Sequence, residues 1–106
     1  MTHTPSKTIL CYGDSNTFGH DPTSPLSARY PDGARWTDRL QPAGWQAVNC
    51  GMNGRCIPVS DAEMRLAVQQ LRAHPADLIA VMLGTNDLLR SAQCRPEDAA
   101  ARIDAF

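Results

Sequence analysis

Residues 78–83, Leu-Ile-Ala-Val-Met-Leu, form an unbroken apolar run that ends at a glycine. Such a run is far too short to cross a membrane, which takes about 20 apolar residues. A short continuous apolar run is typical of a strand that is buried on both faces of a parallel sheet. Because parallel strands need crossover connections, usually helices, this run predicts a chain of alternating strands and helices.

The rest of the chain fits that alternation. Residues 8–12 and 45–50 are short segments rich in apolar and aromatic side chains, and they predict two further strands. Between the first two strands we expect an irregular, proline- and glycine-rich loop over 20–36 and a short helix over 36–40. The order is βαβαβα, so the predicted fold class is α/β with a parallel sheet.

Two longer helices are predicted from their first residues. Ser60 and Glu63 have the spacing of a capping box, and the helix that follows is expected to end near residues 74–75. Apolar residues then recur on one helical face at positions 64, 67, 68 and 71. Pro96 favours the first turn of a last helix, along one side of which lie residues 99, 103 and 106.

Composition excludes several classes of function. The chain has 106 residues and a net charge of -1, and it shows no cluster of Lys or Arg, which argues against nucleic-acid binding and against an anionic membrane surface. The first eight residues are polar, so no secretory signal is expected. Four cysteines without such a signal favour a reduced, cytoplasmic protein over a disulfide scaffold.

A polar segment follows each predicted strand directly. In open α/β sheets, ligands bind beyond the carboxyl ends of the strands. The three segments that reach this edge are GDSN at 13–16, NCGMNG at 49–54 and LGTND at 83–87. Their convergence predicts a site, and we expect its groups to face one small pocket.

The residue types in these segments fit acyl transfer. Ser15 supplies a nucleophile, Gly54 a backbone N–H and Asn86 a side-chain amide donor, and with the Ser15 N–H they form an oxyanion hole. Each segment alone has an ordinary structural explanation, because Gly13, Gly54 and Gly84 suit turns and Asn86 suits a helix cap. Three such segments at one edge favour the site.

These segments resemble the conserved blocks of the SGNH hydrolases, also called GDSL-type esterases and lipases. The sequence GDSN resembles the first block, VNCGMNG (48–54) the second and GTND (84–87) the third, and RWTDRL (35–40) is similar to a stretch in the arylesterase and acyltransferase branch. The resemblance implies a three-layer α/β/α parallel sheet of the flavodoxin-like SGNH hydrolase fold, here incomplete with about three strands. Residues 1–106 are then the N-terminal portion of a single domain.

The resemblance also implies residue roles. Ser15 is the nucleophile, and Gly54 and Asn86 complete the oxyanion hole. Gly13, Gly84, Asp14 and Asp87 support these groups, the acids by hydrogen bonds. No cofactor is implied. The expected substrate is a small-molecule carboxylic ester with a short acyl group.

One element of the family pattern is missing from the sequence. The fourth block, Asp-x-x-His with the general base, does not occur in these 106 residues. His3 lies in a polar tail and His74 at a helix end, where a cation suits the dipole. His20 is near Ser15 in sequence, but only Asp21 is at hand to orient it. The base is therefore expected outside this sequence.

Other site types have weaker support. Cys50 and Cys56 are separated by five residues and have no flanking histidine pair, so a zinc site is not predicted, although Asp14 and Asp87 leave open a metal at the sheet edge. Cys11 is expected in the core and Cys94 in a loop. The alternative to an esterase is a non-catalytic fragment or interaction module that keeps the fold edge.

Specificity and assembly stay open at this level. The residues do not distinguish an esterase from a thioesterase, a carbohydrate deacetylase or a transferase. A three-stranded half-sheet leaves an exposed edge and an uncovered apolar face, which a second copy of the chain or the missing C-terminal half would cover.

Overall fold

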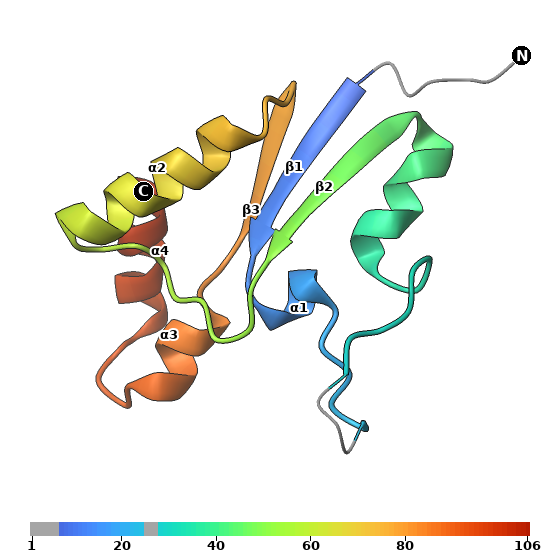
Figure 1. Ribbon diagram of the computed structural model, residues 1–106. Helices are drawn as coiled ribbons and strands as arrows, with labels where there is room; N and C mark the ends of the chain where they lie inside the picture. Colours follow the sequence, from blue (N-terminus) through green and yellow to red (C-terminus); the bar gives the residue numbers. More distant parts are fainter. Residues whose placement is uncertain (1–6, 25–27) are drawn as a thin grey trace, which may run out of the picture.

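The computed structural model describes residues 7–24 and 28–106. Three parallel strands form one sheet in the order β2–β1–β3 and comprise β1 (Lys7–Gly13), β2 (Trp45–Gly51) and β3 (Leu78–Met82). The helical segments are α1 (Ser15–Phe18), the 3-10 helix η1 (Trp36–Ala43), α2 (Asp61–Ala73), α3 (Thr85–Arg90) and α4 (Pro96–Ala105). This architecture confirms the α/β class and the three-stranded parallel sheet (Figure 1).

One face of the sheet carries the apolar core. Leu10 and Tyr12 point to this face from the central strand and pack against Ala67 of α2. Leu71 of α2 and the C-terminal Phe106 extend the cluster, and the Phe106 ring lies 5.9 Å from that of Tyr12. Burial of these side chains holds α2 and the end of α4 on the sheet.

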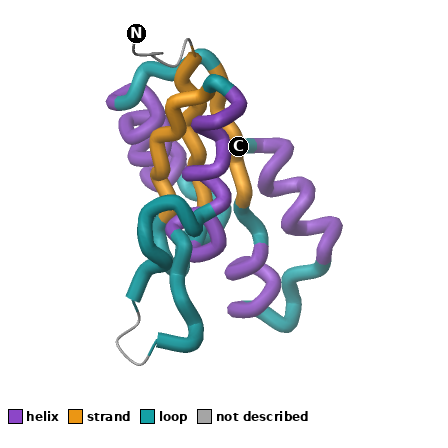
Figure 2. The backbone as a smooth tube through the Cα atoms, turned by 90° about the vertical axis from the view of Figure 1, so that its right-hand side faces the viewer, coloured by secondary structure: helices purple, strands orange, loops and turns teal. Residues whose placement is uncertain are grey.

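Polar contacts hold the opposite face. Cys11 of β1 is fully buried there, and Asn49 lies beside it on β2. The Asn49 amide donates to the Thr17 carbonyl of α1 at 2.7 Å and to the Thr37 hydroxyl of η1 at 3.0 Å. These bonds fix α1 and η1 against β2, so the strands lie between helical segments, as Figure 2 shows.

Strand β3 departs from the prediction that it is buried on both faces. Leu78, Ile79, Val81 and Met82 are 42–48% exposed. Side chains of a strand point to the two faces of the sheet, and the described helical segments pack mainly on β1 and β2, so the side chains of β3 stay partly uncovered. Strand β3 is also an edge of the sheet. An apolar strand at an edge presents unpaired backbone groups together with apolar side chains, which is a surface that other chains can cover.

The predicted caps of α2 are present. The Ser60 hydroxyl accepts from the Glu63 N–H at 3.1 Å, and the Glu63 carboxylate accepts from the Ser60 N–H at 3.0 Å.

Val68 and Ile103, which we assigned to the packed faces of their helices, are 39% and 38% exposed. Across residues 7–24 and 28–106, no helix has the length and apolar character needed to span a membrane.

Candidate active site

The carboxyl ends of the three strands meet at one edge. Gly13 at the end of β1 is aligned with Gly51 of β2 and with Met82 of β3. In Figure 1 this edge points downward, and α1, the loop before α2, and α3 all lie there. The structure thus brings Ser15, Gly54 and the segment of Asn86 to the same end of the sheet, as the order of the motifs predicts.

Ser15 begins α1 immediately after the strand. Asp14 is the N-cap, and its Oδ1 accepts from the Asn16 N–H at 3.0 Å. Gly13 lets the chain turn closely, because a Cβ there would lie 2.2 Å from the Thr17 hydroxyl oxygen. Ser15 is half-buried, and it lines a cavity of about 360 Å³ together with Asn16, Gly19, His20, Pro22 and Tyr30.

Gly54 occupies a tight turn after β2. The Arg55 N–H donates to the Met52 carbonyl at 3.2 Å and closes this turn. Gly54 has a φ of +79°, the left-handed value that glycine tolerates at the third position of a type II turn. It lines a cavity of about 380 Å³ whose walls include Tyr12 and Arg90. Ser15 and Gly54 thus line different cavities. That Ser15, Gly54 and Asn86 face one small pocket stays a prediction.

The side chain of Asn86 lies against the turn that holds Gly54. Its Nδ2 donates to the Arg55 carbonyl at 3.1 Å. Asn86 stands in the first turn of α3, whose N-cap Gly84 has a φ of +124°. An asparagine amide has two N–H donors, so one remains for a ligand while the other fixes the side chain beside Gly54.

Asp87 joins α3 to the loop before α2 and to α4, whereas Asp14 caps its own helix. Asp87 is 4% exposed, and its carboxylate accepts from the Ile57 N–H at 3.0 Å and from Arg102 of α4 at 3.1 Å. The hydrogen bond to Asp87 raises the pKa of Arg102. Asp14 caps α1 with one oxygen, while its buried Oδ2 has no hydrogen-bond partner in the described part of the chain. Both acids therefore make hydrogen bonds, but only those of Asp87 join separate segments, and the supporting role of the two acids stays a prediction.

Neither described histidine has the contacts of a triad base. His20 shares the Ser15 cavity, but its Nδ1 is buried and has no hydrogen-bond partner within residues 7–24 and 28–106. Asp21 does not orient that nitrogen, because its Oδ1 accepts from both the N–H and the hydroxyl of Thr23, bonds that lower its pKa. His74 is the exposed C-cap of α2. His3 lies outside the described residues.

The described residues contain no group of three or more His, Cys, Asp or Glu side chains arranged to hold a metal ion. All four cysteines are free. Cys11 is a core residue, as predicted, and burial together with the nearby Cys50 raises its pKa to about 11. Cys94 follows the end of α3 in a turn.

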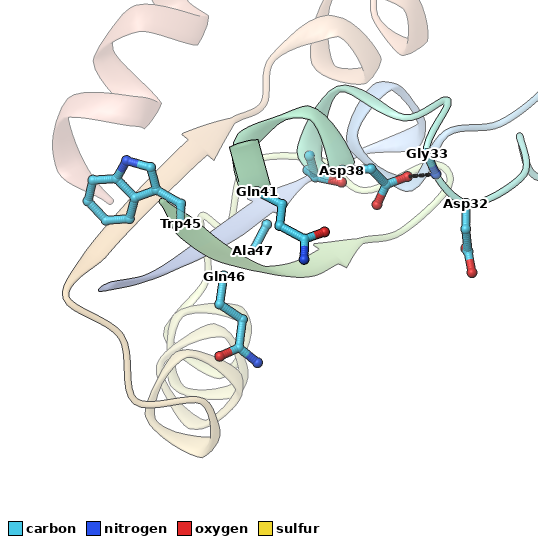
Figure 3. A pocket seen from close by; sticks show the side chains of 8 residues that line it. Asp32, Gly33, Asp38, Gln41, Trp45, Gln46 and Ala47 are labelled. Atoms are coloured by element: carbon cyan, nitrogen blue, oxygen red, sulfur yellow. Dashed lines mark hydrogen bonds between the residues drawn. The ribbon is translucent and has the colours of Figure 1, made fainter. Parts of the chain in front are cut away.

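A further cavity of about 420 Å³ lies between η1 and the edge of β2, and sequence reasoning did not find it (Figure 3). Trp45 and Gln46, in its wall, begin β2, which places part of this cavity at the end of the strand away from Ser15. Its carboxylate Asp38 is engaged by the Gly33 N–H at 2.8 Å. The cavity is therefore separate from the candidate site.

Sequence reasoning also missed Arg55. This residue is 8% exposed, and it follows Gly54 directly. The available signal was a charged residue between Gly54, which we predict to be an oxyanion donor, and the apolar Ile57.

Comparison with known proteins agrees with the fold. Residues 11–105 match the model of the GDSL-like Lipase/Acylhydrolase family. A carbohydrate acetylesterase family member from Sinorhizobium meliloti is 35% identical, with a TM-score of 0.78, and the match covers 92% of this chain and 50% of that one. The aryl esterase of M. smegmatis is 31% identical, with a TM-score of 0.80, over 93% of this chain and 52% of that one.

A second carbohydrate acetylesterase from Sinorhizobium meliloti, Est24, is 28% identical, with a TM-score of 0.73, over 92% of this chain and 51% of that one. The chain therefore spans about half the length of the solved structures it matches. Comparison with curated proteins found no match. The family match extends over most of the 106 residues, and the chain belongs to the GDSL-like lipase/acylhydrolase family, the SGNH hydrolases.

Proposed function

We propose that this chain supplies the nucleophile and the oxyanion-binding half of a serine esterase site that cleaves carboxylic esters with short acyl groups. The observation that carries the proposal is the common edge of Ser15, Gly54 and Asn86, with the Asn86 amide bonded to the carbonyl that follows Gly54. Asp14 and Asp87, with Gly13 and Gly84, support these groups.

In the proposed reaction the Ser15 Oγ attacks the ester carbonyl carbon. The carbonyl oxygen becomes an oxyanion that accepts from the Ser15 N–H, the Gly54 N–H and the free Asn86 N–H. Each such donor contributes roughly 3–4 kcal/mol of transition-state stabilisation. The alcohol then leaves with a proton, and water or another alcohol removes the acyl group from Ser15.

A general base must take the Ser15 proton during the attack. We propose that an Asp-x-x-His segment outside residues 1–106 provides it. This assignment is supported by the unpartnered His20 Nδ1 and by the half-length match to the relatives. The names of the matched esterases favour acetyl as the acyl group and a sugar or an aryl group on the alcohol side. The four free cysteines are compatible with the proposed cytoplasmic location.

The exposed β3 favours a second candidate, a non-catalytic module that binds another chain. Its four large apolar side chains are 42–48% exposed at an unpaired edge. A second copy or the second half of an SGNH domain would cover them. Under this alternative Ser15 forms no acyl intermediate.

The test is hydrolysis of p-nitrophenyl acetate by two proteins. One is the chain of residues 1–106, and the other is a fusion of it to the second half of the M. smegmatis aryl esterase. We expect the chain alone to be nearly inactive and the fusion to turn over. Ser15→Ala should abolish turnover by the fusion, while the matched variant Ser91→Ala, at the exposed C-cap of α3, should not change it. Unchanged hydrolysis by the Ser15 variant would exclude the nucleophile.

A further inference from the structure

The charged side chain of Arg55 is buried, and it contacts backbone carbonyl oxygens. Its Nη1 donates to the Cys50 carbonyl and, at 3.2 Å, to the Gly13 carbonyl, and its guanidinium carbon lies 4.0 Å from the centre of the Tyr12 ring. Within the described residues no carboxylate lies at ion-pair distance from Arg55. A buried cation without a charged partner is costly, so ordinary packing does not account for an arginine here.

The backbone of the same residue holds the candidate oxyanion groups. The Arg55 N–H closes the turn that contains Gly54, and the Arg55 carbonyl accepts the Asn86 amide at 3.1 Å. The guanidinium, in turn, is fixed to the last residue of β1, two positions before Ser15. One residue thus links all three polar segments of the edge.

We infer that Arg55 is a positioning residue that sets the Asn86 amide and the Gly54 turn relative to Ser15. The effect of Arg55 on catalysis rests on the proposed function, whereas its effect on the position of the Asn86 amide rests on the contacts above. Oxyanion donors work because they are held in place before the charge develops. Anchoring the Arg55 backbone through its own side chain supplies that rigidity from the ends of β1 and β2.

The role requires arginine and not merely a cation. The planar guanidinium has five donors in a rigid fork, and it stacks on an aromatic ring. It spans two carbonyls at the ends of neighbouring strands and lies over Tyr12, with Gln70 Oε1 of α2 at 3.5 Å from its Nη2. Both carbonyl bonds come from Nη1, so what a lysine cannot reproduce is their combination with the Nη2 contact to Gln70 and the stacking on Tyr12, because its ammonium is a compact point charge.

The structural test uses residues 1–106 and the side-chain amide resonances of Asn86 in 1H–15N spectra. Arg55→Lys should move these resonances toward those of a free amide, because the Arg55 carbonyl shifts. Arg55→Met, which fills the space over Tyr12 without donors, should do the same. Arg72→Lys, on the exposed end of α2, is the control and should move nothing. Circular dichroism identifies the folded variants, and unchanged Asn86 resonances in a folded Arg55 variant would overturn the inference.

The kinetic test uses the fusion described above. Arg55→Lys should lower kcat about 10–100-fold, less than or equal to the loss of a whole oxyanion donor, and should change KM far less. In an Asn86→Ala background Arg55→Lys should lower kcat by less than it does alone, because the part of its effect that acts through the Asn86 amide is already lost. Independent, multiplying effects would contradict the inference. Hydrolysis that does not depend on Ser15 would instead refute the proposed function, and the Asn86 resonances would still test Arg55.

Discussion

Gly51 is the position where one added methyl group should do most damage to the site. A Cβ there would lie 2.2 Å from the Phe18 backbone nitrogen, 2.6 Å from its Cα and 2.7 Å from the Thr17 carbonyl carbon. All three are backbone atoms of α1, so no side chain can rotate out of the way. Gly51→Ala must therefore push α1, which begins at Ser15, away from β2.

The cost can be placed at the upper end of the range for overpacking. One extra methylene in a packed core typically costs 1–3 kcal/mol, and the contacts here are with rigid backbone, so we expect about 3 kcal/mol or more. Gly33→Ala is the comparison variant, because a Cβ on Gly33 would have nothing within 4 Å, although its φ of +89° adds a strain that Gly51 does not have. Left-handed strain alone should cost it about 1–2 kcal/mol.

Urea denaturation of the chain measures both free energies of unfolding. We expect Gly51→Ala to lose clearly more stability than Gly33→Ala. In the fusion, Gly51→Ala should also impair hydrolysis at Ser15, while Gly33→Ala should leave it intact. Equal losses for the two variants would refute the close packing of α1 on β2, and with it our account of how Ser15 is placed.

Three further predictions concern the supporting residues. Hydrogen bonds from Ser60 lower the pKa of Glu63. The stabilising contribution of the Glu63 carboxylate is therefore present above about pH 4.3 and is lost as the pH falls through the lowered pKa. In urea denaturation, the difference in free energy of unfolding between the unchanged chain and Glu63→Gln should shrink from pH 6 to pH 3. Burial raises the pKa of Cys11 to about 11. At pH 8, iodoacetamide should therefore modify the half-buried Cys94 well before Cys11, and peptide mass mapping measures both rates. Equal rates would contradict the burial of Cys11. Asp87→Asn should lower the free energy of unfolding by about 2 kcal/mol. This is less than the 3–5 kcal/mol typical of a broken buried ion pair, because the arginine partner of Asp87 on α4 is 38% exposed. A urea midpoint equal to that of the unchanged chain would contradict this prediction.

Local sequence patterns predicted the elements that have a clear period or cap. The apolar runs located all three strands, and Ser60, Glu63 and Pro96 located the first turns of α2 and α4. The helices α1 and α3 were missed because four and six residues are too few to show a helical period. Their positions depend on the sheet edge and on distant contacts, such as the bond of Asn49 to α1 and those of Asp87 in α3.

The burial of β3 could not be predicted from its own residues. A continuous apolar run indicates that both faces are covered, but whether they are depends on which elements the sheet contains. Here the described helical segments pack mainly on β1 and β2, so the apolar side chains of β3 stay partly exposed.

Only part of the candidate site could be predicted from the sequence, because the rest depends on contacts between distant residues. The motifs after each strand predicted which segments meet at the edge. The contacts of Arg55 with Gly13 and Cys50 join residues 42 and 5 positions apart. Nothing in a local pattern predicts which carbonyls a buried guanidinium will reach, so its role emerged only from the fold.

Covalent trapping tests the central claim most directly. The claim is that Ser15 is the nucleophile and that its base lies outside residues 1–106. A fluorophosphonate is incubated with the chain alone and with the fusion, and peptide mass mapping locates the adduct. We predict an adduct on Ser15 in the fusion and almost none on the chain alone. An adduct at another residue, or labelling of the chain alone at the same rate that is lost in His20→Ala, would contradict the claim.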